Sequence, residues 1–164
     1  MQNKRILITG ISGLIGRETI NFLKDNEFEI VAISNNSPIA DKTIKHIKCS
    51  IFDTQSLQSF IASTKPTHLL HLAWKSTGNF NSNEKYDFIS SSISMLRAFA
   101  ENGGKKVVIA GTYVEYGYNN STLSEFSSTT SPLYIYGQCK HHLHAIAESF
   151  CKSNDISLNW GRVF

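Results

Sequence analysis

The sequence is poor in cysteine: only Cys49, Cys139 and Cys151 occur among its 164 residues. The number is odd, and no two cysteines have the CxxC spacing. Neither a disulfide framework nor a zinc site is therefore expected. Such cysteine usage suits a reducing compartment, so we expect a cytoplasmic location.

Long apolar runs and basic clusters are also missing. No stretch approaches the about 18 apolar residues of a membrane-spanning helix, and the first residues lead into an expected strand rather than a signal peptide. The formal net charge is +3, and lysine and arginine form no stripe along the sequence. These features argue against a membrane segment and against a nucleic-acid partner.

What the sequence does contain is a regular alternation of short apolar runs with segments of helical periodicity. Its length suffices for one domain with a core. Strands are expected at residues 4–9, 29–34, 45–49, 68–72, 106–110 and 156–162, and helices at 14–26, 54–63, 83–102 and 134–153. The alternation predicts an α/β fold, a doubly wound parallel Rossmann sheet of six strands with helices on both faces.

A glycine-rich segment, Thr9-Gly-Ile-Ser-Gly-Leu-Ile-Gly16, lies where the first strand turns into the first helix. Gly10 allows a tight turn, Gly13 lets the backbone approach a pyrophosphate, and Gly16 lets the helix pack closely on the sheet. Backbone amides at the start of the helix would then hold the anion. The alternative is a glycine-rich turn that binds nothing.

Tyr136 and Lys140 lie four residues apart on the last expected helix, hence one turn apart on the same face. A nearby cation favours a phenolate, so the spacing predicts that the pKa of Tyr136 falls from its usual value of about 10 toward neutrality. Such a phenol is suited to exchange protons with a carbonyl/alcohol couple. A chance pairing of two common residues is the alternative.

Three further segments follow expected strands in the same order as in a known family. They are Cys49-Ser-Ile-Phe-Asp53, His71-Leu-Ala-Trp74 and Gly111-Thr-Tyr-Val-Glu-Tyr-Gly117. Together with the TGxxGxxG loop and the Tyr136/Lys140 pair, they resemble the extended short-chain dehydrogenases/reductases. Within that superfamily the chain is similar to the NAD-dependent epimerase/dehydratase family, which acts on nucleotide sugars, and the likeness spans essentially all of it.

The resemblance implies a mechanism. Tyr136 would exchange the proton of the substrate hydroxyl or carbonyl while the nicotinamide exchanges the hydride. Lys140 would lower the pKa of Tyr136 and bind the ribose, and Thr112 would orient the reacting oxygen. Three alternatives are purely structural: Thr112 only ends a strand, Asp53 only caps the next helix, and His71 is a core residue rather than a catalytic one.

The resemblance also implies a set of residues along the cofactor. These are Gly10, Ser12, Gly13, Leu14, Ile15, Gly16, Ser34, Asn35, Ile51, Phe52, Asp53, Leu72, Ala73, Trp74, Tyr136 and Lys140. No metal ligand is expected, because His141, His142 and His144 spread around their helix without an acidic or cysteine partner nearby.

Departures from the family's motifs narrow the range of reactions that we expect. The 4,6-dehydratases place an Asp-Glu pair directly after the catalytic threonine, where this chain has Tyr113 and Val114. Glu115 comes one residue later, on the opposite face if the segment is extended. Dehydration is thus disfavoured, and a 4-epimerase or a 4-keto reductase remains. Phe88 falls near the position of the family's helix asparagine, and Trp74 replaces a small residue and narrows the site.

The identity of the cofactor depends on the end of the second strand. NAD enzymes usually carry an acidic residue there, and this chain has Ser34 and Asn35 instead. Without a carboxylate nothing repels a 2′-phosphate, and Arg17 could reach it. NAD and NADP both remain open, with NADP favoured.

Three readings of the chain's role remain. The first is the cofactor-binding domain, residues 1–164, of an enzyme acting on a sugar nucleotide, with the C-terminal substrate domain absent. The second is a non-catalytic NAD(P)-sensing module, against which the intact Tyr136, Lys140 and Thr112 argue. In the third, the helices at 83–102 and 134–153 form a homodimer, as such helices do in extended family members.

Overall fold

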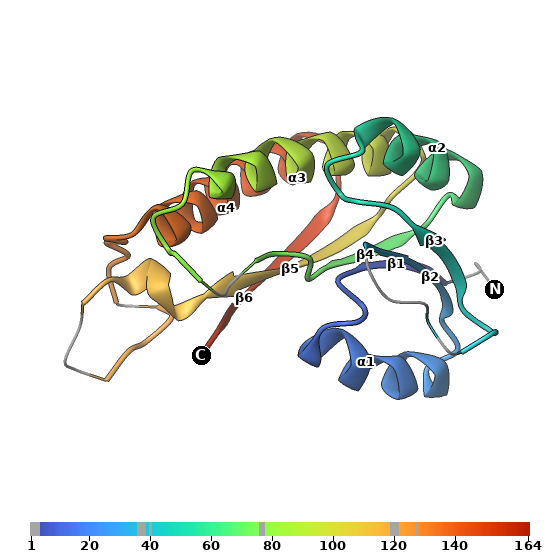
Figure 1. Cartoon of the computed structure of the whole chain (residues 1–164), viewed down its shortest axis with the longest axis horizontal. Helices are drawn as coiled ribbons and strands as arrows, with labels where there is room; N and C mark the ends of the chain where they lie inside the picture. Colours follow the sequence, from blue (N-terminus) through green and yellow to red (C-terminus); the bar gives the residue numbers. More distant parts are fainter. Residues whose placement is uncertain (1–3, 36–38, 40, 76–77, 119–121, 127) are drawn as a thin grey trace.

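The computed structural model describes residues 4–35, 39, 41–75, 78–118, 122–126 and 128–164. Within them, strands and helices alternate around one sheet (Figure 1). The strands are β1 (Arg5–Thr9), β2 (Glu29–Ser34), β3 (Lys45–Lys48), β4 (His68–His71), β5 (Lys106–Thr112) and β6 (Ser157–Val163). The helices are α1 (Leu14–Asp25), α2 (Thr54–Thr64), α3 (Glu84–Glu101), α4 (Ile135–Ser153) and the short 3₁₀ helix η1 (Tyr113–Tyr116).

The sheet has six strands in the order β3-β2-β1-β4-β5-β6, and every neighbouring pair is parallel. The chain first moves from β1 outward to β3, and then returns to place β4, β5 and β6 on the other side of β1. The order therefore reverses between β1 and β4. In open sheets of this kind a ligand binds at the carboxyl ends of the strands beside that reversal.

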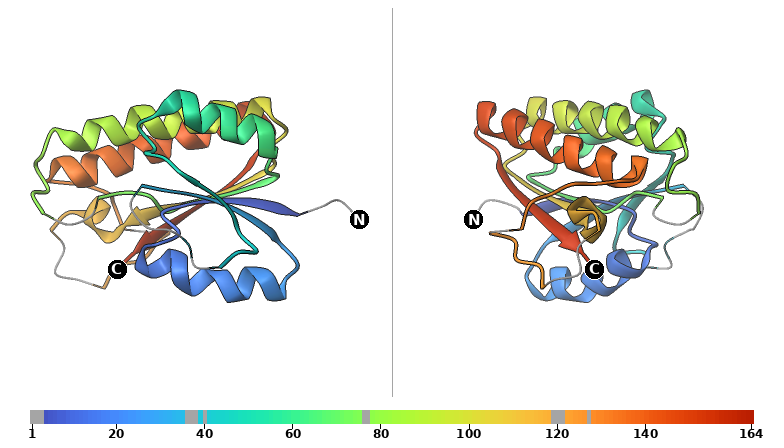
Figure 2. Two further views of the ribbon diagram at one scale, coloured as in Figure 1. Left: turned by 45° about the vertical axis from the view of Figure 1, so that its right-hand side comes forward. Right: turned by 90° about the vertical axis from the view of Figure 1, so that its left-hand side faces the viewer.

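The helices cover both faces of the sheet unequally (Figure 2). α1 packs on one face, where Ile6, Ile8, Leu23 and Ile30 contribute to a small apolar cluster. α2, α3 and α4 lie together on the other face. The larger cluster below them is built from buried residues of strands and helices, among them Leu7, Leu57, Leu69, Met95, Phe99, Val107, Ile109 and Ala147.

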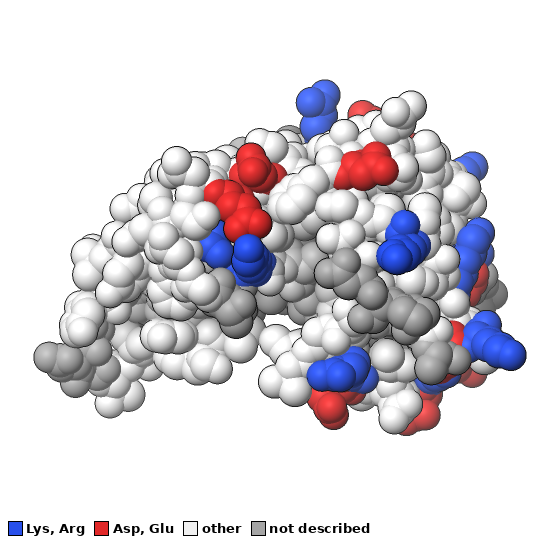
Figure 3. Space-filling model, in the orientation of Figure 1, with Lys and Arg blue, Asp and Glu red and all other residues white. Residues whose placement is uncertain are grey.

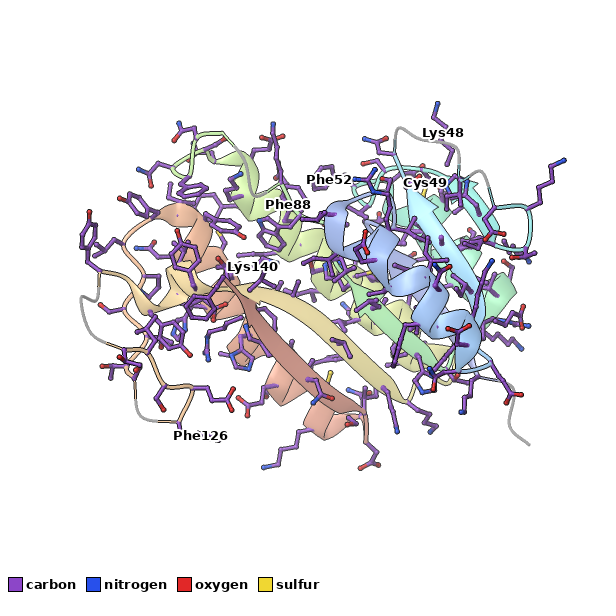
Figure 4. All side chains as sticks on the ribbon, turned by 90° about the horizontal axis from the view of Figure 1, so that it is seen from below. Lys48, Cys49, Phe52, Phe88, Phe126 and Lys140 are labelled. Atoms are coloured by element: carbon purple, nitrogen blue, oxygen red, sulfur yellow. The ribbon has the colours of Figure 1, made fainter. Side chains whose placement is uncertain are left out.

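On the face of the sheet that α1 covers, no helix formed by the described residues packs over β5 and β6 (Figure 4). Seen from that side, β5 and β6 lie in front of α3 and α4, while α1 covers the strands of the other half (Figure 4). The side chains of Val108 and Val163 are each 42% exposed there. Parallel sheets are almost always covered on both faces, so this apolar surface is unusual for a complete fold of this class.

The predicted fold is confirmed: all six strands and all four helices form close to the expected residues. The main difference lies at the end of β5, which continues to Thr112 and is followed directly by η1. The Thr112 side chain accepts a hydrogen bond from the backbone of Val114, and the Glu115 carboxylate accepts one from the backbone of Thr112. This reciprocal capping turns the segment, so the expectation of an extended segment, with Glu115 on the opposite face, is wrong.

Among the described residues, no helix combines the length and the apolar character that crossing a bilayer requires. On the face drawn in Figure 3, the charged side chains of the described residues are of both signs and interspersed.

The packing of α3 makes a first prediction. Phe99 is completely buried in the larger cluster, whereas Phe22 on α1 is 67% exposed. Phe99→Ala should lower the free energy of unfolding by about 3–5 kcal/mol, because it removes the buried ring and leaves a cavity. Phe22→Ala should change it by less than about 0.5 kcal/mol. Urea unfolding of both variants tests this, and similar losses would contradict the assignment of the core.

Candidate active site

The carboxyl ends of β1, β4 and β5 bring together three segments that are far apart in the sequence. Gly10 follows β1, Ala73 and Trp74 follow β4, and Thr112 ends β5. The N-terminal part of α4 adds Tyr136 and Lys140 from beside the same edge. Two cavities open there, and Trp74 lines both of them.

The backbone conformation of the turn after β1 requires glycine. Gly10 has a φ of +75°, and a Cβ there would lie 2.7 Å from the backbone nitrogen of Ala73. A Cβ on Gly16 would lie 2.5 Å from the carbonyl oxygen of Gly10. α1 then begins without a side-chain cap and without an acidic residue in its first turn. An uncapped helix start of this kind is suited to bind an anion.

The larger cavity, of about 640 Å³, extends from the glycine turn past the end of β2. Eight of the residues expected along the cofactor line it: Gly10, Ser12, Ser34, Asn35, Ile51, Phe52, Ala73 and Trp74. Its wall also includes Cys49, Ser50, Lys75, Glu84 and Phe88, which had not been expected there. Its size lies within the about 300–1,000 Å³ typical of ligand sites.

Four expected cofactor residues line neither cavity: Gly13, Leu14, Gly16 and Asp53. Asp53 caps α2, where its carboxylate accepts a hydrogen bond of 3.1 Å from the backbone of Ser56. Hydrogen bonds from the Ser56 side chain and then from its backbone lower the pKa of Asp53. The capping alternative is therefore present in the structure, and a contact of Asp53 with the cofactor stays a prediction.

The smaller cavity, of about 220 Å³, holds the three candidate catalytic residues together. Thr112, Tyr136 and Lys140 all line it, although Thr112 comes from the sheet and the other two from α4. Ile15, Leu72 and Trp74 complete the expected part of its wall. All three polar residues are at most 5% exposed, so their side chains are almost completely shielded from water.

Burial has the largest effect on the pKa of the Tyr136 phenol. The ring stacks on Phe80 with a centroid separation of 5.3 Å. Burial raises the pKa of Tyr136 above its usual value, a hydrogen bond with Thr112 works in the opposite direction, and the charges of Glu115 and Tyr113 raise it further. The predicted fall of the Tyr136 pKa toward neutrality is therefore wrong in this structure.

The position of Lys140 explains why the pKa of Tyr136 is not lowered. Its Nζ donates a hydrogen bond of 2.6 Å to the carbonyl oxygen of Ala110 and lies 3.9 Å from the centroid of the Trp74 ring. Burial lowers the pKa of Lys140 to about 7, and the Glu115 charge opposes that shift. The ammonium thus contacts a carbonyl and an indole, and desolvation outweighs the attraction that the sequence spacing suggested.

An aromatic stack connects the two cavities. Trp74 stacks on Phe88 at 4.8 Å, and Phe88 meets the edge of Phe52 at 4.8 Å. Phe52, Phe88 and Lys140 follow one another along this edge of the sheet in Figure 4. Phe88 therefore fills its position with an apolar ring that supports Trp74.

Phe80 and Lys85 join the site without any signal in the sequence. Phe80 accepts a backbone hydrogen bond from Tyr136 in addition to stacking on it. Lys85, on α3, is 1% exposed and donates a hydrogen bond of 2.6 Å to the carbonyl oxygen of Lys75, and its Nζ lies 5.8 Å from the Tyr136 ring centroid. Neither contact could be found from spacing, because each joins separate elements.

His71 is a structural residue. Its two ring nitrogens contact Thr9 Oγ1 at 2.6 Å and Ser92 Oγ at 2.9 Å. Complete burial lowers the pKa of His71 to about 3, so the ring is neutral at ordinary pH. The hydrogen bonds tie β1, β4 and α3 together behind the site.

The histidines after Lys140 have separate environments. His144 is half-buried and stacks on Trp160 at 4.6 Å, His142 contacts the carbonyl oxygen of Gln138, and His141 packs edge-on against His142. In the described part of the chain, no three His, Cys, Asp or Glu side chains come close enough to hold a metal ion.

The fold and the site define a dinucleotide-binding α/β domain with a Thr, Tyr and Lys set beside its cavity. The chain belongs to the NAD-dependent epimerase/dehydratase family, whose model matches residues 6–164. The predicted family is thereby confirmed.

Individual relatives agree with this placement. The chain is 24% identical over 180 residues to a dTDP-6-deoxy-L-talose 4-dehydrogenase (NAD(+)) from Aggregatibacter actinomycetemcomitans, covering 97% of the chain and 60% of the relative. It is 28% identical over 151 residues to a UDP-glucose 4-epimerase from Rhizobium meliloti, covering 85% and 45%.

A solved structure extends the comparison. The Bordetella bronchiseptica enzyme WbmG in complex with NAD and UDP superimposes with a TM-score of 0.77 at 26% identity. The match covers 98% of the chain and 53% of that protein. The chain thus spans about half to three fifths of the length of these relatives.

The buried ammonium predicts a pH dependence of stability. The pKa of Lys140 is about 7 in the folded chain against 10.5 as the ordinary value, so between these values the unfolded chain binds more protons. Stability from this group should rise with pH across that window, by up to about 1.4 kcal/mol per pH unit. Lys140→Met should remove this rise.

Urea unfolding at several pH values from about 7 to 9 measures the effect. Lys152→Met is the matched control, because Lys152 is exposed on the same helix. Equal pH slopes in the wild-type chain and in Lys140→Met would contradict the burial of the charge.

Proposed function

We propose that this chain carries the cofactor-binding and reacting part of an NAD(P)-dependent enzyme that exchanges hydride at a secondary carbon of a nucleotide-linked sugar. The convergence of Thr112, Tyr136 and Lys140 on one buried cavity carries the proposal. The nucleotide-sugar enzymes among the relatives support the substrate class.

Each residue has a defined task in this proposal. The dinucleotide, when bound, supplies or accepts the hydride. Tyr136 donates or accepts the proton at its hydroxyl oxygen, and Thr112 holds the reacting oxygen beside it. Phe80 and Trp74 would exclude water, and Lys140 would bind the ribose hydroxyls.

The protonation of Tyr136 favours one direction of the reaction. Its pKa is raised by burial, so the phenol is neutral at ordinary pH and acts first as a proton donor. A proton donor suits the reduction of a ketone to an alcohol. We therefore favour a 4-keto reductase, and a 4-epimerase is the alternative that begins with oxidation.

Elimination of water is not part of the proposal. The 4,6-dehydratases use a carboxylic acid and a carboxylate directly after the threonine, and Tyr113 and Val114 carry no carboxyl group. Glu115 is turned away, since its carboxylate accepts hydrogen bonds from Thr112, Trp160 and Arg162. A carboxylate engaged in this way is not free to move a substrate proton.

We further propose that residues 1–164 are the cofactor half of a longer enzyme. The uncovered face of β5 and β6 and the length of the relatives support this. The smaller cavity of about 220 Å³ lies below the about 300 Å³ at which ligand sites usually begin. Most contacts to the sugar nucleotide would then come from the other half, in a cytoplasmic enzyme that dimerises through α3 and α4.

A non-catalytic NAD(P)-binding module is the second candidate. One observation favours it: the Lys140 ammonium contacts Ala110 and Trp74 rather than the phenol. In such a module the dinucleotide would bind without any turnover that depends on Tyr136.

Cofactor binding is the first test of these proposals. The chain should bind NADH and NADPH, and NADPH at least as tightly, because β2 ends in Ser34 and Asn35 without a carboxylate. Asn35→Asp should weaken NADPH binding about tenfold and leave NADH binding nearly unchanged, since the new charge repels a 2′-phosphate. Isothermal titration calorimetry measures both, and a chain that binds neither nucleotide refutes the proposal.

The role of Tyr136 is the second test. In the full-length protein, Tyr136→Phe should reduce turnover about 10²- to 10⁴-fold while NADH affinity stays unchanged, because only the proton donor is lost. The redox state of the cofactor that co-purifies separates the reactions: tightly retained NAD indicates an epimerase, and freely exchanging NADPH a reductase. Turnover that survives Tyr136→Phe would contradict the assignment, and turnover by residues 1–164 alone would contradict the proposed division.

A further inference from the structure

Glu115 joins the end of β5 to the edge strand β6. Its side chain is completely buried on η1. One carboxylate oxygen accepts hydrogen bonds from the backbone of Thr112 at 2.9 Å and from Trp160 Nε1 at 3.0 Å. The other accepts one from Arg162 Nε at 3.0 Å. The carboxylate therefore connects a candidate catalytic residue with two side chains of the neighbouring strand.

The backbone beside Thr112 leaves room for this arrangement. A Cβ on Gly111 would lie 2.2 Å from Trp160 Nε1 and 2.7 Å from the carboxylate oxygen that this nitrogen contacts. Tyr116 also contacts Arg162: the guanidinium carbon lies 5.0 Å from the centroid of the Tyr116 ring, and Nη1 donates a hydrogen bond of 3.4 Å to the Tyr116 hydroxyl. Gly111, Glu115, Trp160 and Arg162 thus fit one another as a set.

The charges of the pair reach the active site. The Glu115 charge raises the pKa of both Tyr136 and Lys140. It also raises the pKa of His144, whose ring stacks on Trp160, whereas the charge of Arg162 lowers it. The titratable groups that interact with the carboxylate, with Arg162 or with Tyr136 come from three elements: Tyr113 and Tyr116 from η1, Arg162 from β6, and Tyr136, Lys140 and His144 from α4.

We propose that the Glu115–Arg162 ion pair is a positioning device for the active site. The carboxylate holds the backbone of Thr112 beside Tyr136, and Arg162 offsets part of the carboxylate charge, which opposes a phenolate. The inference rests on the proposed function, since it concerns the proton donor of that reaction. Glu115 and Arg162 are positioning residues, because neither lines the cavity that contains Tyr136.

The two partners should act on Tyr136 in opposite directions. Glu115→Gln removes a negative charge and should lower the pKa of Tyr136 by about 0.5 pH unit or more. Arg162→Gln leaves the carboxylate uncompensated and should raise it by a similar amount. The chain carrying ¹³Cζ-labelled tyrosine reports this by NMR titration, and Tyr136→Phe identifies the resonance among the six tyrosines.

Two control variants distinguish an effect of the removed charge from a disruption of the local structure. Arg162→Lys keeps the charge and should restore the wild-type pKa, and Glu101→Gln makes the same charge change at an exposed position and should have no effect. Partial unfolding would expose the ring and lower the pKa in both Gln variants. Shifts of Glu115→Gln and Arg162→Gln in the same direction, or no shift in either, overturn the inference.

The positioning of Thr112 needs its own measurement. The hydrogen bond from Thr112 lowers the pKa of Tyr136, so Thr112→Val should raise it. The rise should be smaller in a Glu115→Met background, whose side chain cannot hold the Thr112 amide. Equal rises in the two backgrounds overturn the positioning role. These titrations need no cofactor, so a chain that fails to bind NADH refutes the proposed function by a separate result.

Discussion

The site depends on the backbone register between β1 and β4. Thr9 pairs with His71 across these strands, and His71 pairs with Ile109 of β5. A shift of one residue would turn every side chain of a strand to the other face. It would also separate Gly10 from the backbone of Ala73, against which the glycine turn packs without room for a Cβ. The buried hydrogen bonds of His71 to Thr9 and Ser92 hold this register, so a residue with no chemical task determines where the chemical groups meet.

Desolvation then decides the state of the groups that meet there. Tyr136 and Lys140 share one helix face, but the ammonium faces Trp74 and the carbonyl of Ala110. A smaller side chain at position 74 would leave that space to solvent or ligand. With an indole present, the interactions that change the protonation of the pair come from Thr112, from the Glu115 charge and from whatever occupies the cavity. The chemistry of the pair is therefore a property of its surroundings more than of its spacing.

The fold could be predicted because its signals are local. Residues 29–34 form a buried strand and residues 14–25 an amphipathic helix whatever their distant partners, and the glycine turn needs its glycines for its own geometry. The membership of Thr112, Tyr136 and Lys140 in one site could also be predicted, from the order of motifs along known strands. The pKa of Tyr136 and the place of Glu115 could not. Burial is a sum over many elements, and the partner of Glu115, Arg162, lies 47 residues further along the chain.

The fate of Glu115 also bears on the kind of reaction this scaffold supports. A carboxylate near a reacting oxygen either moves protons or holds structure, because a group with fixed charge-assisted partners gains little from protonation. Here the carboxylate caps η1 and binds Arg162, and Gly111 leaves the space for it. A role for this carboxylate in acid-base chemistry would require a new partner for the partly buried Arg162 guanidinium and a new cap for the segment that presents Thr112. Elimination chemistry would thus require several coupled changes in this chain, whereas the hydride exchange that we propose uses side chains that already lie at the edge of the sheet.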